Sequence, residues 1–343
     1  MGAAKTNQHR RDALPPLRRL LVFNSHEAWV YQLGALDVDL DIVVGLKGRH
    51  VAEWDTHMRP VPRRARLVTL PQLRRSRERY DCIIAHSLTD LLAVTDRPGP
   101  RLVIMHTTLE GRVREEHSQV TATQMSDLLA RYTQMIGAHA ISVSALKAAS
   151  WGLHDYVPFA PDPEGYRQHQ GDVAAGLRIC NLVTKRRQIL LWDLHERAFA
   201  GLPVRIVGHN PDLPGVRAAA DWDELKLLMA QHRFYIHTAV PGLEDGYNMA
   251  TLEAMAAGLP VLGNKHASSP VEHGKSGFLS DDAEELRGYA QQLLNDADLA
   301  ARMGRAARQR VAEKFSPQTF CQGMLQAIAT ARLKFCSRPP MKT

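Results

Sequence analysis

Short apolar runs alternate with longer amphipathic or polar segments through the first half of the chain. The runs that predict strands lie at residues 20–23, 40–45, 66–70, 82–85, 102–105 and 140–143. Short strands in such an alternation favour a parallel sheet whose two faces are covered by helices. Ligands of such sheets bind beyond the carboxyl ends of the strands. We therefore predict an α/β domain over residues 18–150.

A second alternation follows the segment 151–165, which is rich in Pro and Gly and is predicted to be an interdomain linker. Its expected strands lie at 178–183, 204–207, 234–237 and 261–262, and a helix is expected over 223–231. Amphipathic segments at 283–295, 299–314 and 317–333 predict three more helices. The pattern indicates a second α/β domain over 166–315. Residues 1–17 are basic and polar and are predicted to be disordered.

One stretch, 243–262, combines several unusual features. An acidic loop reaches Asp245 and Gly246, an Ala-rich helix follows, and Gly258 with Pro260 ends that helix. A loop that leads into a helix N-terminus offers unpaired backbone N–H groups, which suit a phosphate. Glu253 shares a helical face with apolar residues, so its carboxylate needs a partner, and a sugar or ribose hydroxyl would serve. The simpler interpretation is a surface loop followed by a core helix.

This stretch resembles the signature of the glycogen-synthase-like retaining glycosyltransferases (group 1, family four). In that signature an acid, seven residues and a Glu precede an Ala-Met-Ala-x-Gly-x-Pro-Val turn. Asp245 takes the place of the first acid, and Glu253 is the second. The similarity continues through 273–279, 302–304 and 314–316, and it covers about residues 178–320.

The resemblance implies a GT-B fold, in which two Rossmann-like domains face one another and a C-terminal crossover helix, 316–333, packs back on the N-terminal domain. That domain would serve the acceptor, and the C-terminal domain would bind a nucleotide sugar, UDP- or GDP-linked, without metal or cofactor. The catalytic residues implied are Asp245, Arg186, Lys185 and His106. The donor-binding residues implied are Glu253, Gly246, Tyr247, Asn248, Met249, Ala250, Asn181 and Gly208.

The sequence departs from the family at the loop that should stabilise the leaving diphosphate. Asn181 stands where the family has an Arg, and Arg186 stands where it has a Lys, with Lys185 and Arg187 beside it to compensate. The loop 24–27 after the first strand lacks the family's glycines. These departures keep a second hypothesis open: a catalytically degenerate GT-B protein that binds a nucleotide, a glycan or a protein partner.

Composition indicates the class of protein and the compartment in which we expect it. The chain of 343 residues has 45% hydrophobic and 23% charged residues, which is typical of a soluble globular protein. The sequence shows neither a membrane-spanning run nor the apolar core of a signal peptide, and its four cysteines are scattered. We therefore expect a cytoplasmic protein with free thiols.

The net charge of +7 is concentrated in part between residues 59 and 79, where eight arginines accompany one acid. Such a run is most often a solvated face. It also suits an anionic membrane, which would place the protein on the inner face of the membrane, or nucleic acid phosphates. The only adjacent aromatic residue is Tyr80, so base stacking has little support and nucleic acid is the weaker alternative.

The function predicted is retaining transfer of a sugar from a nucleotide-sugar donor to an unidentified acceptor. A glycan, a lipid-linked precursor or a polysaccharide precursor is the acceptor class preferred. The degenerate binding protein and a glycosyltransferase that acts on nucleic acid are the alternatives.

Overall fold

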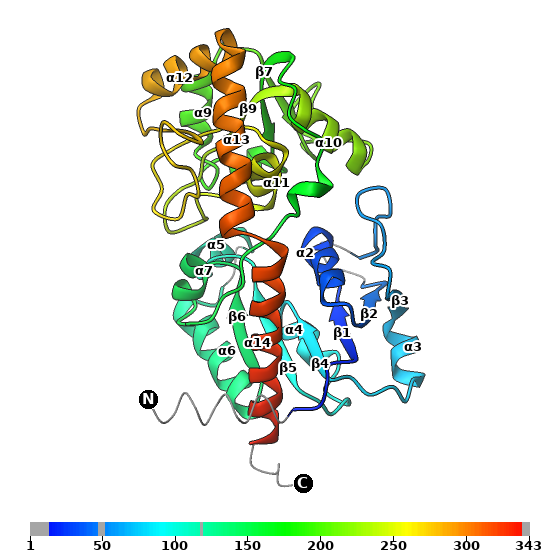
Figure 1. Cartoon of the computed structure of the whole chain (residues 1–343). Coiled ribbons are helices and arrows are strands. Elements are labelled where there is room, and N and C mark those ends of the chain that lie inside the picture. The colour runs from blue at the N-terminus through cyan, green and yellow to red at the C-terminus, as the bar shows by residue number, and fades with distance from the viewer. Residues whose placement is uncertain (1–13, 47–51, 117–118, 338–343) are drawn as a thin grey trace, which may run out of the picture. The chain divides into compact units, whose positions relative to one another are not determined.

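The computed structural model describes residues 14–46, 52–116 and 119–337. The chain divides into two compact units (Figure 1). The first unit comprises residues 1–109, 119–158 and 320–343, and the second comprises 110–118 and 159–319. The division after Pro158 falls inside the segment 151–165 that was expected to be a linker. Of the expected disordered tail, residues 1–13 lie outside the described residues.

The described residues of the first unit form a six-stranded parallel sheet in the order β3-β2-β1-β4-β5-β6. All six expected strands are present within about one residue at each end. Their bounds are β1 Arg19–Phe23, β2 Asp39–Val44, β3 Ala65–Thr69, β4 Cys82–Ala85, β5 Arg101–Met105 and β6 His139–Ser142. The inner strands are buried on both faces, as the near-continuous apolar runs predict.

Helices accompany these strands, and their ends follow ordinary capping chemistry. In α6, for example, Thr121 and Gln124 form a reciprocal capping box, and Gly137 ends the helix in the left-handed conformation. The helices of this unit are α2 Glu27–Gln32, α3 Leu70–Arg75, α4 Leu88–Leu92, α6 Ala122–Ile136 and α7 Ala145–Ser150, with the 3-10 helix η1 Leu33–Leu36.

The last helix, α14 Pro317–Cys336, packs on the first unit from Phe320 onward (Figure 1). The Phe320 ring meets the edge of the Trp29 ring, with 5.9 Å between the centroids. Near the other end of the helix, Lys334 Nζ lies 3.1 Å from His139 Nδ1. The helix predicted for residues 317–333 therefore contacts α2 and β6, which lie about 200 to 300 residues earlier in the chain.

The described strands of the second unit form a five-stranded parallel sheet in the order β11-β10-β9-β7-β8. The strands are β7 Val173–Ile179, β8 Val204–Val207, β9 His232–His237, β10 Val261–Gly263 and β11 Gly277–Leu279. The helices are α5 Leu109–Glu115, α8 Val183–Arg186, α9 Trp192–Phe199, α10 Trp222–Gln231, α11 Met249–Ala257, α12 Ala283–Asn295 and α13 Ala297–Lys314, with η2 Pro163–Gly165.

The strand expected over 178–183 was placed wrongly at both ends, since β7 begins at Val173. Strand β7 stops at Ile179, and Leu182 adopts a left-handed conformation, with φ 52° and ψ 45°, as the residue before α8. Val183 is buried as part of that short helix, in a cluster with Leu190 and Trp192. The apolar pair Leu182 and Val183 was misread as strand because a short apolar run does not reveal its own secondary structure.

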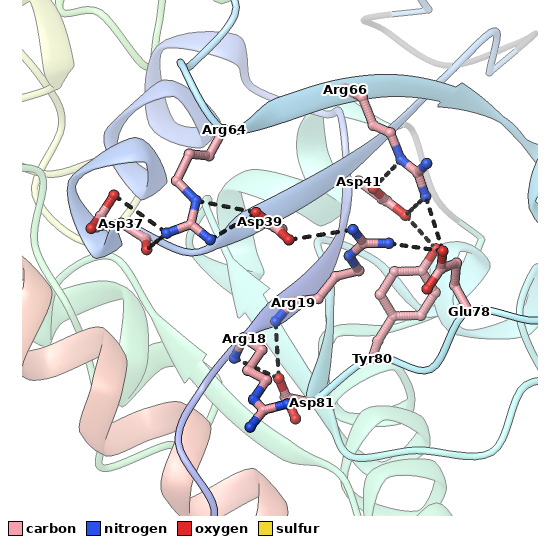
Figure 2. Close-up of polar contacts among 10 residues, drawn as sticks. All are labelled: Arg18, Arg19, Asp37, Asp39, Asp41, Arg64, Arg66, Glu78, Tyr80 and Asp81. Carbon is pink, nitrogen blue, oxygen red and sulfur yellow. Dashed lines mark hydrogen bonds and ion pairs between the residues drawn. The ribbon is translucent and has the colours of Figure 1, made fainter.

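An ion-pair network ties together the edge of the first sheet (Figure 2). Asp41 on β2 is buried; its Oδ1 lies 2.6 Å from Arg66 Nε on β3, and its Oδ2 lies 2.6 Å from the hydroxyl of Tyr80. Asp39 accepts a 2.8 Å hydrogen bond from Arg64 in the same way. The parallel register of β2 and β3 places these acids and arginines in adjacent rows.

This network divides the arginine-rich segment into two groups. Arg64 and Arg66 pair with acids of β2, and Arg59 is buried. The members of the other group are exposed and have no partner among the residues that the structure describes: Arg63, Arg74, Arg75, Arg77 and Arg79. Hypotheses of an anionic surface partner therefore concern Arg63 and the arginines of α3 and of the loop after it.

Replacing Asp41 by Asn is expected to destabilise the protein by about 2 kcal/mol, because Arg66 and Tyr80 lose a charged acceptor. Burial alone raises the pKa of Asp41, but hydrogen bonds from Arg66 and Tyr80 outweigh it and hold the pKa below its usual value. A carboxylate with a lowered pKa stabilises the fold above the pKa of the unfolded chain, and loses that contribution as pH falls through the lower, folded value. Urea unfolding should therefore show a wild-type advantage at pH 7 that shrinks below about pH 4. An advantage that does not change with pH would contradict the assignment.

Candidate functional site

Two loops of the second unit meet at one edge of its sheet. Strands β7 and β9 are parallel neighbours, so the loops that follow them, 180–186 and 238–248, begin at the same edge. An ion pair joins the loops, with 3.5 Å between Arg186 Nη2 and Glu244 Oε2. The sheet thus brings residues that are about 60 positions apart in the sequence to one edge, where parallel α/β sheets bind ligands.

The loop after β7 is fastened to the loop after β8. The Asn181 side chain accepts a 2.8 Å hydrogen bond from the His209 amide, and Asn210 bonds both the Cys180 carbonyl and the Val183 amide. Gly208 has φ 140°, and a Cβ there would lie 2.1 Å from the Cys180 carbonyl oxygen. Asn181 therefore links the two loops, whereas an arginine at this position would supply a positive charge. Gly208 allows the backbones of the two loops to approach each other closely.

The three basic residues of this loop differ in their surroundings. Arg186 pairs with Glu115, at 2.8 Å, as well as with Glu244. Arg187 is bound to Asp193 and Glu196, and the expectation that it compensates for Asn181 stays a prediction. Lys185 is exposed and has no partner among the described residues. An incoming phosphate would meet Lys185 directly, but it would have to replace carboxylates on Arg186.

The loop after β9 leads into α11 as predicted. Asp245 is 1% exposed, and its backbone carbonyl lies 3.1 Å from His237 Nε2. A Cβ at Gly246 would lie 2.8 Å from the His266 side chain, so the position needs glycine. Asn248 caps the helix in a capping box with Thr251, and Gly258 ends it with φ 91°. The cap occupies the Thr251 amide, and the Gly246 and Asn248 amides donate to the side-chain oxygens of Ser268 and Thr251.

Glu253 has a partner within this chain. The residue is 5% exposed, and the Tyr166 hydroxyl donates a 2.9 Å hydrogen bond to Glu253 Oε1. Sequence reasoning foresaw that this carboxylate needed a donor but missed Tyr166, which lies 87 residues away. Tyr247 and Met249 are also buried, and the Tyr247 ring packs on Phe315. Their side chains therefore pack within this unit.

His106 belongs to the first unit, where it follows β5, and His86 follows β4. The two rings are hydrogen bonded, with 2.7 Å between His86 Nδ1 and His106 Nε2. His26 stacks on His106 with nearly parallel planes, at a centroid distance of 5.7 Å. Burial lowers the pKa of His86 to about 3 and lowers that of His106 well below its usual value. Both rings are therefore neutral near pH 7, and they offer hydrogen bonds rather than positive charge.

These neutral histidines predict that the protein loses stability in mild acid. A histidine with a lowered pKa stabilises the fold above the unfolded value of about 6.5, and that contribution disappears as pH falls toward the folded value. Between about pH 6.5 and pH 3, His86 should contribute a slope of about 1.4 kcal/mol per pH unit to the unfolding free energy. We expect His86→Gln to remove this slope in urea titrations at pH 6.5, 5.5 and 4.5. Equal slopes in the two proteins would contradict it.

No group of three or more His, Cys, Asp or Glu side chains in the described part of the chain is arranged to hold a metal ion. Nor does any described helix combine the length and apolarity needed to cross a bilayer.

Residues 186–326 match the family model described as "Glycosyl transferase-like". Among curated relatives, the N-acetyl-alpha-D-glucosaminyl L-malate synthase of Bacillus anthracis is 36% identical over 76 residues, which is 21% of this chain and 20% of that protein. The O-antigen chain mannosyltransferase B of Escherichia coli is 29% identical over 109 residues, which is 31% of this chain and 25% of that protein. The matched segments thus span about a fifth to a quarter of the length of these relatives.

Solved structures resemble the chain over most of its length. Anabaena Alr3699/HepE, in complex with UDP and glucose, has a TM-score of 0.65 at 16% identity, covering 91% of this chain and 99% of that one. An alpha-glucosyltransferase, in complex with UDP and a 13-mer DNA, has a TM-score of 0.61 at 13% identity, covering 92% and 100%. At these identities the likeness establishes the fold. The predicted resemblance is confirmed: residues 186–326 are similar to the group 1 glycosyltransferases, and the fold of the chain is GT-B.

Proposed function

We propose that this protein is a metal-independent, retaining glycosyltransferase that moves a sugar from a UDP- or GDP-linked donor to a glycan, lipid-linked or polysaccharide precursor. The observation that carries the proposal is the buried pair Asp245 and Glu253 on either side of the N-terminus of α11, at the carboxyl edge of the second sheet. The family match over this region and the UDP bound in structures of the same fold support it.

Each part of the site has a role in this proposal. Glu253, with Tyr166, would accept and orient the ribose hydroxyls, and Asp245 would position the hydroxyls of the donor sugar. The amides from Gly246 to Ala250 would hold the distal phosphate or the sugar, because a helix N-terminus favours an anion. For this the Gly246 and Asn248 amides would exchange their bonds to Ser268 and Thr251 for bonds to the ligand. Lys185, and Arg186 once released from its carboxylates, would stabilise the charge that grows on the leaving diphosphate. His106, neutral and hydrogen bonded, suits contact with sugar hydroxyls.

The reaction proposed needs no protein nucleophile. The bond between the sugar C1 and the diphosphate oxygen breaks while the acceptor oxygen bonds to C1 from the same face. The acceptor proton passes to the leaving phosphate oxygen, so the anomeric configuration is retained. The relatives named for polysaccharide and cell-envelope glycosyl transfer support an acceptor of that class.

A second candidate is a GT-B protein that binds its ligand without turnover. The ion pairs of Arg186 with Glu115 and Glu244 favour it, because they neutralise the cation that would otherwise receive the diphosphate. Asn181, engaged with the loop after β8, removes a further cation.

The two candidates are separated by incubating the purified protein with UDP-, GDP-, ADP- and TDP-sugars and following donor hydrolysis by mass spectrometry. The enzyme is expected to hydrolyse one donor slowly without added metal and in the presence of a chelator. With an acceptor in hand, NMR of the product should show the anomeric configuration of the donor. The binding protein would be favoured if a nucleotide stabilised the protein thermally while neither donor hydrolysis nor transfer to any acceptor tried was detected. Neither hydrolysis nor stabilisation would overturn both candidates.

A further inference from the structure

An arginine is buried in the second sheet without an acidic partner. Arg178, the penultimate residue of β7, is 2% exposed, and its Nη2 donates a 2.9 Å hydrogen bond to the Leu190 carbonyl. Its guanidinium lies over the Trp192 ring, 4.7 Å from the centroid. The other terminal nitrogen, Nη1, is buried and finds no hydrogen-bond partner within the described part of the chain. No described carboxylate forms an ion pair with Arg178.

The surroundings of Arg178 do not neutralise its charge. An arginine stays protonated in proteins, and burial of an unpaired charge is strongly unfavourable. Four titratable side chains interact with the guanidinium, those of Cys180, Tyr235, His195 and His237, and they are uncharged near pH 7. Burial raises the pKa of Cys180 and of Tyr235, and burial together with Arg178 lowers the pKa of His195 to about 2. Burial likewise lowers the pKa of His237 to about 4.

Hydrogen bonds connect the Arg178 guanidinium to the candidate site. The Leu190 carbonyl that accepts from Arg178 also accepts a 2.6 Å hydrogen bond from Thr238 Oγ1, and Thr238 begins the loop after β9. His237, the neighbouring residue, contacts the Asp245 carbonyl. Arg178 is thus attached to the edge from which both site loops extend, two residues before the loop that contains Asn181 and Lys185.

We infer that Arg178 is a buried positioning charge, whose field draws the diphosphate of a nucleotide ligand to the loops after β7 and β9. The inference rests on the proposed nucleotide-sugar function and assigns to that site a residue that does not touch the ligand. A buried guanidinium that serves only packing is readily replaced by an apolar side chain of similar length, often with a gain in stability. If the charge of Arg178 attracts an anionic ligand over a distance, that role explains why an arginine is buried at this position.

The test compares ligands that differ in charge. Arg178→Met keeps the length of the side chain and removes its charge, and Arg178→Lys keeps the charge. Arg233→Met is the matched control: Arg233 lies near the amino end of β9, at the opposite edge of the same sheet, and also donates to backbone carbonyls. Calorimetry would measure binding of uridine, UMP and UDP, of the guanosine series, and of inorganic pyrophosphate. Melting temperatures of the free proteins would be recorded in parallel.

For Arg178→Met we expect unchanged affinity for the nucleoside, a smaller loss for the monophosphate, and a loss on the order of tenfold for the diphosphate, since the Coulomb interaction scales with ligand charge. Its melting temperature should equal or exceed that of the wild type, and Arg178→Lys should recover much of the diphosphate affinity. Arg233→Met should melt lower than the wild type and show no loss that grows with ligand charge.

The other outcomes are distinct. If nucleotides bind but Arg178→Met weakens all ligands equally or none, the inference is overturned and the proposed function stands. A lower melting temperature with a uniform loss of binding would identify Arg178 as structural, for example as the counter-charge of a loop carboxylate. If the protein binds pyrophosphate with an affinity that depends on Arg178 but binds no nucleotide, the anion site is supported and the nucleotide-sugar function is overturned. If the wild type binds neither pyrophosphate nor any nucleotide, the inference about Arg178 and the proposed function are both overturned.

Discussion

Asp245→Asn and Glu253→Gln are each expected to lower kcat/KM for the donor by about a hundredfold or more, a loss typical of charged groups that orient a reacting substrate. Both substitutions keep the shape of the side chain and remove its negative charge. Each parent residue is almost fully buried, Asp245 in the loop before α11 and Glu253 in the middle of that helix. The measurement is the initial rate of hydrolysis of whichever sugar donor the panel identifies.

Two controls separate this loss from damage to the fold. Glu272→Gln removes a more exposed acid of the same unit, one that pairs with Lys275 and Arg310, and should leave the rate unchanged. Tyr166→Phe removes only the hydroxyl that donates to Glu253, so we expect a higher KM for the donor with a smaller change in kcat. Rates within tenfold of the wild type in both carboxylate variants, with unchanged melting temperatures, would remove the site from the proposal.

Gly304→Ala is expected to destabilise the protein by about 3 kcal/mol, an overpacking cost at the upper end of the usual range. Gly304 lies in α13, and a Cβ there would be 1.9 Å from the Gly258 carbonyl oxygen, in the turn that ends α11. The neighbour is backbone rather than a movable side chain, so the helices must separate. The measurement is the urea unfolding midpoint of the variant.

The matched control for Gly304 is Gly288 in α12, where an added Cβ would meet nothing within 4 Å. Gly288→Ala should stabilise the protein by roughly 0.5–1 kcal/mol, because alanine loses less backbone freedom in a helix than glycine does. The contrast isolates the packing of α13 on α11 from helix propensity. A loss at Gly304 no larger than the effect at Gly288 would show that the two helices adjust without cost.

Helix α11 could be predicted from the sequence alone, because local chemistry sets its ends. Gly258 and Pro260 end α11 because one adopts the left-handed conformation and the other lacks the N–H that a helix needs. The strands of the first sheet were placed correctly for a similar reason, since buried parallel strands are short apolar runs bounded by polar loops. The strand at 178–183 failed because Leu182 and Val183 are apolar yet belong to a turn and a short helix.

Side-chain partners could not be predicted, because they depend on contacts between distant segments. The arginine-rich segment looked uniform in sequence, but the register of β2 and β3 pairs Arg66 with Asp41, 25 residues away, and leaves Arg74 exposed. The carboxylate that binds Arg186, from Glu115, lies 71 residues from it. Nothing near Arg178 in the sequence shows that it is buried without an acidic partner.

The sequence by itself determined the two α/β alternations, the helix α11 with its caps, and the paired acids Asp245 and Glu253, because periodicity, capping and motif spacing are short-range properties. Only the tertiary structure decided which charges of the site are paired and which are exposed. Glu253 meets Tyr166, Arg186 meets two carboxylates, and Lys185 stays exposed. The physical reason is that the energy of a charge depends on its burial and on its neighbours in space, and these are set by the packing of the sheet and its loops.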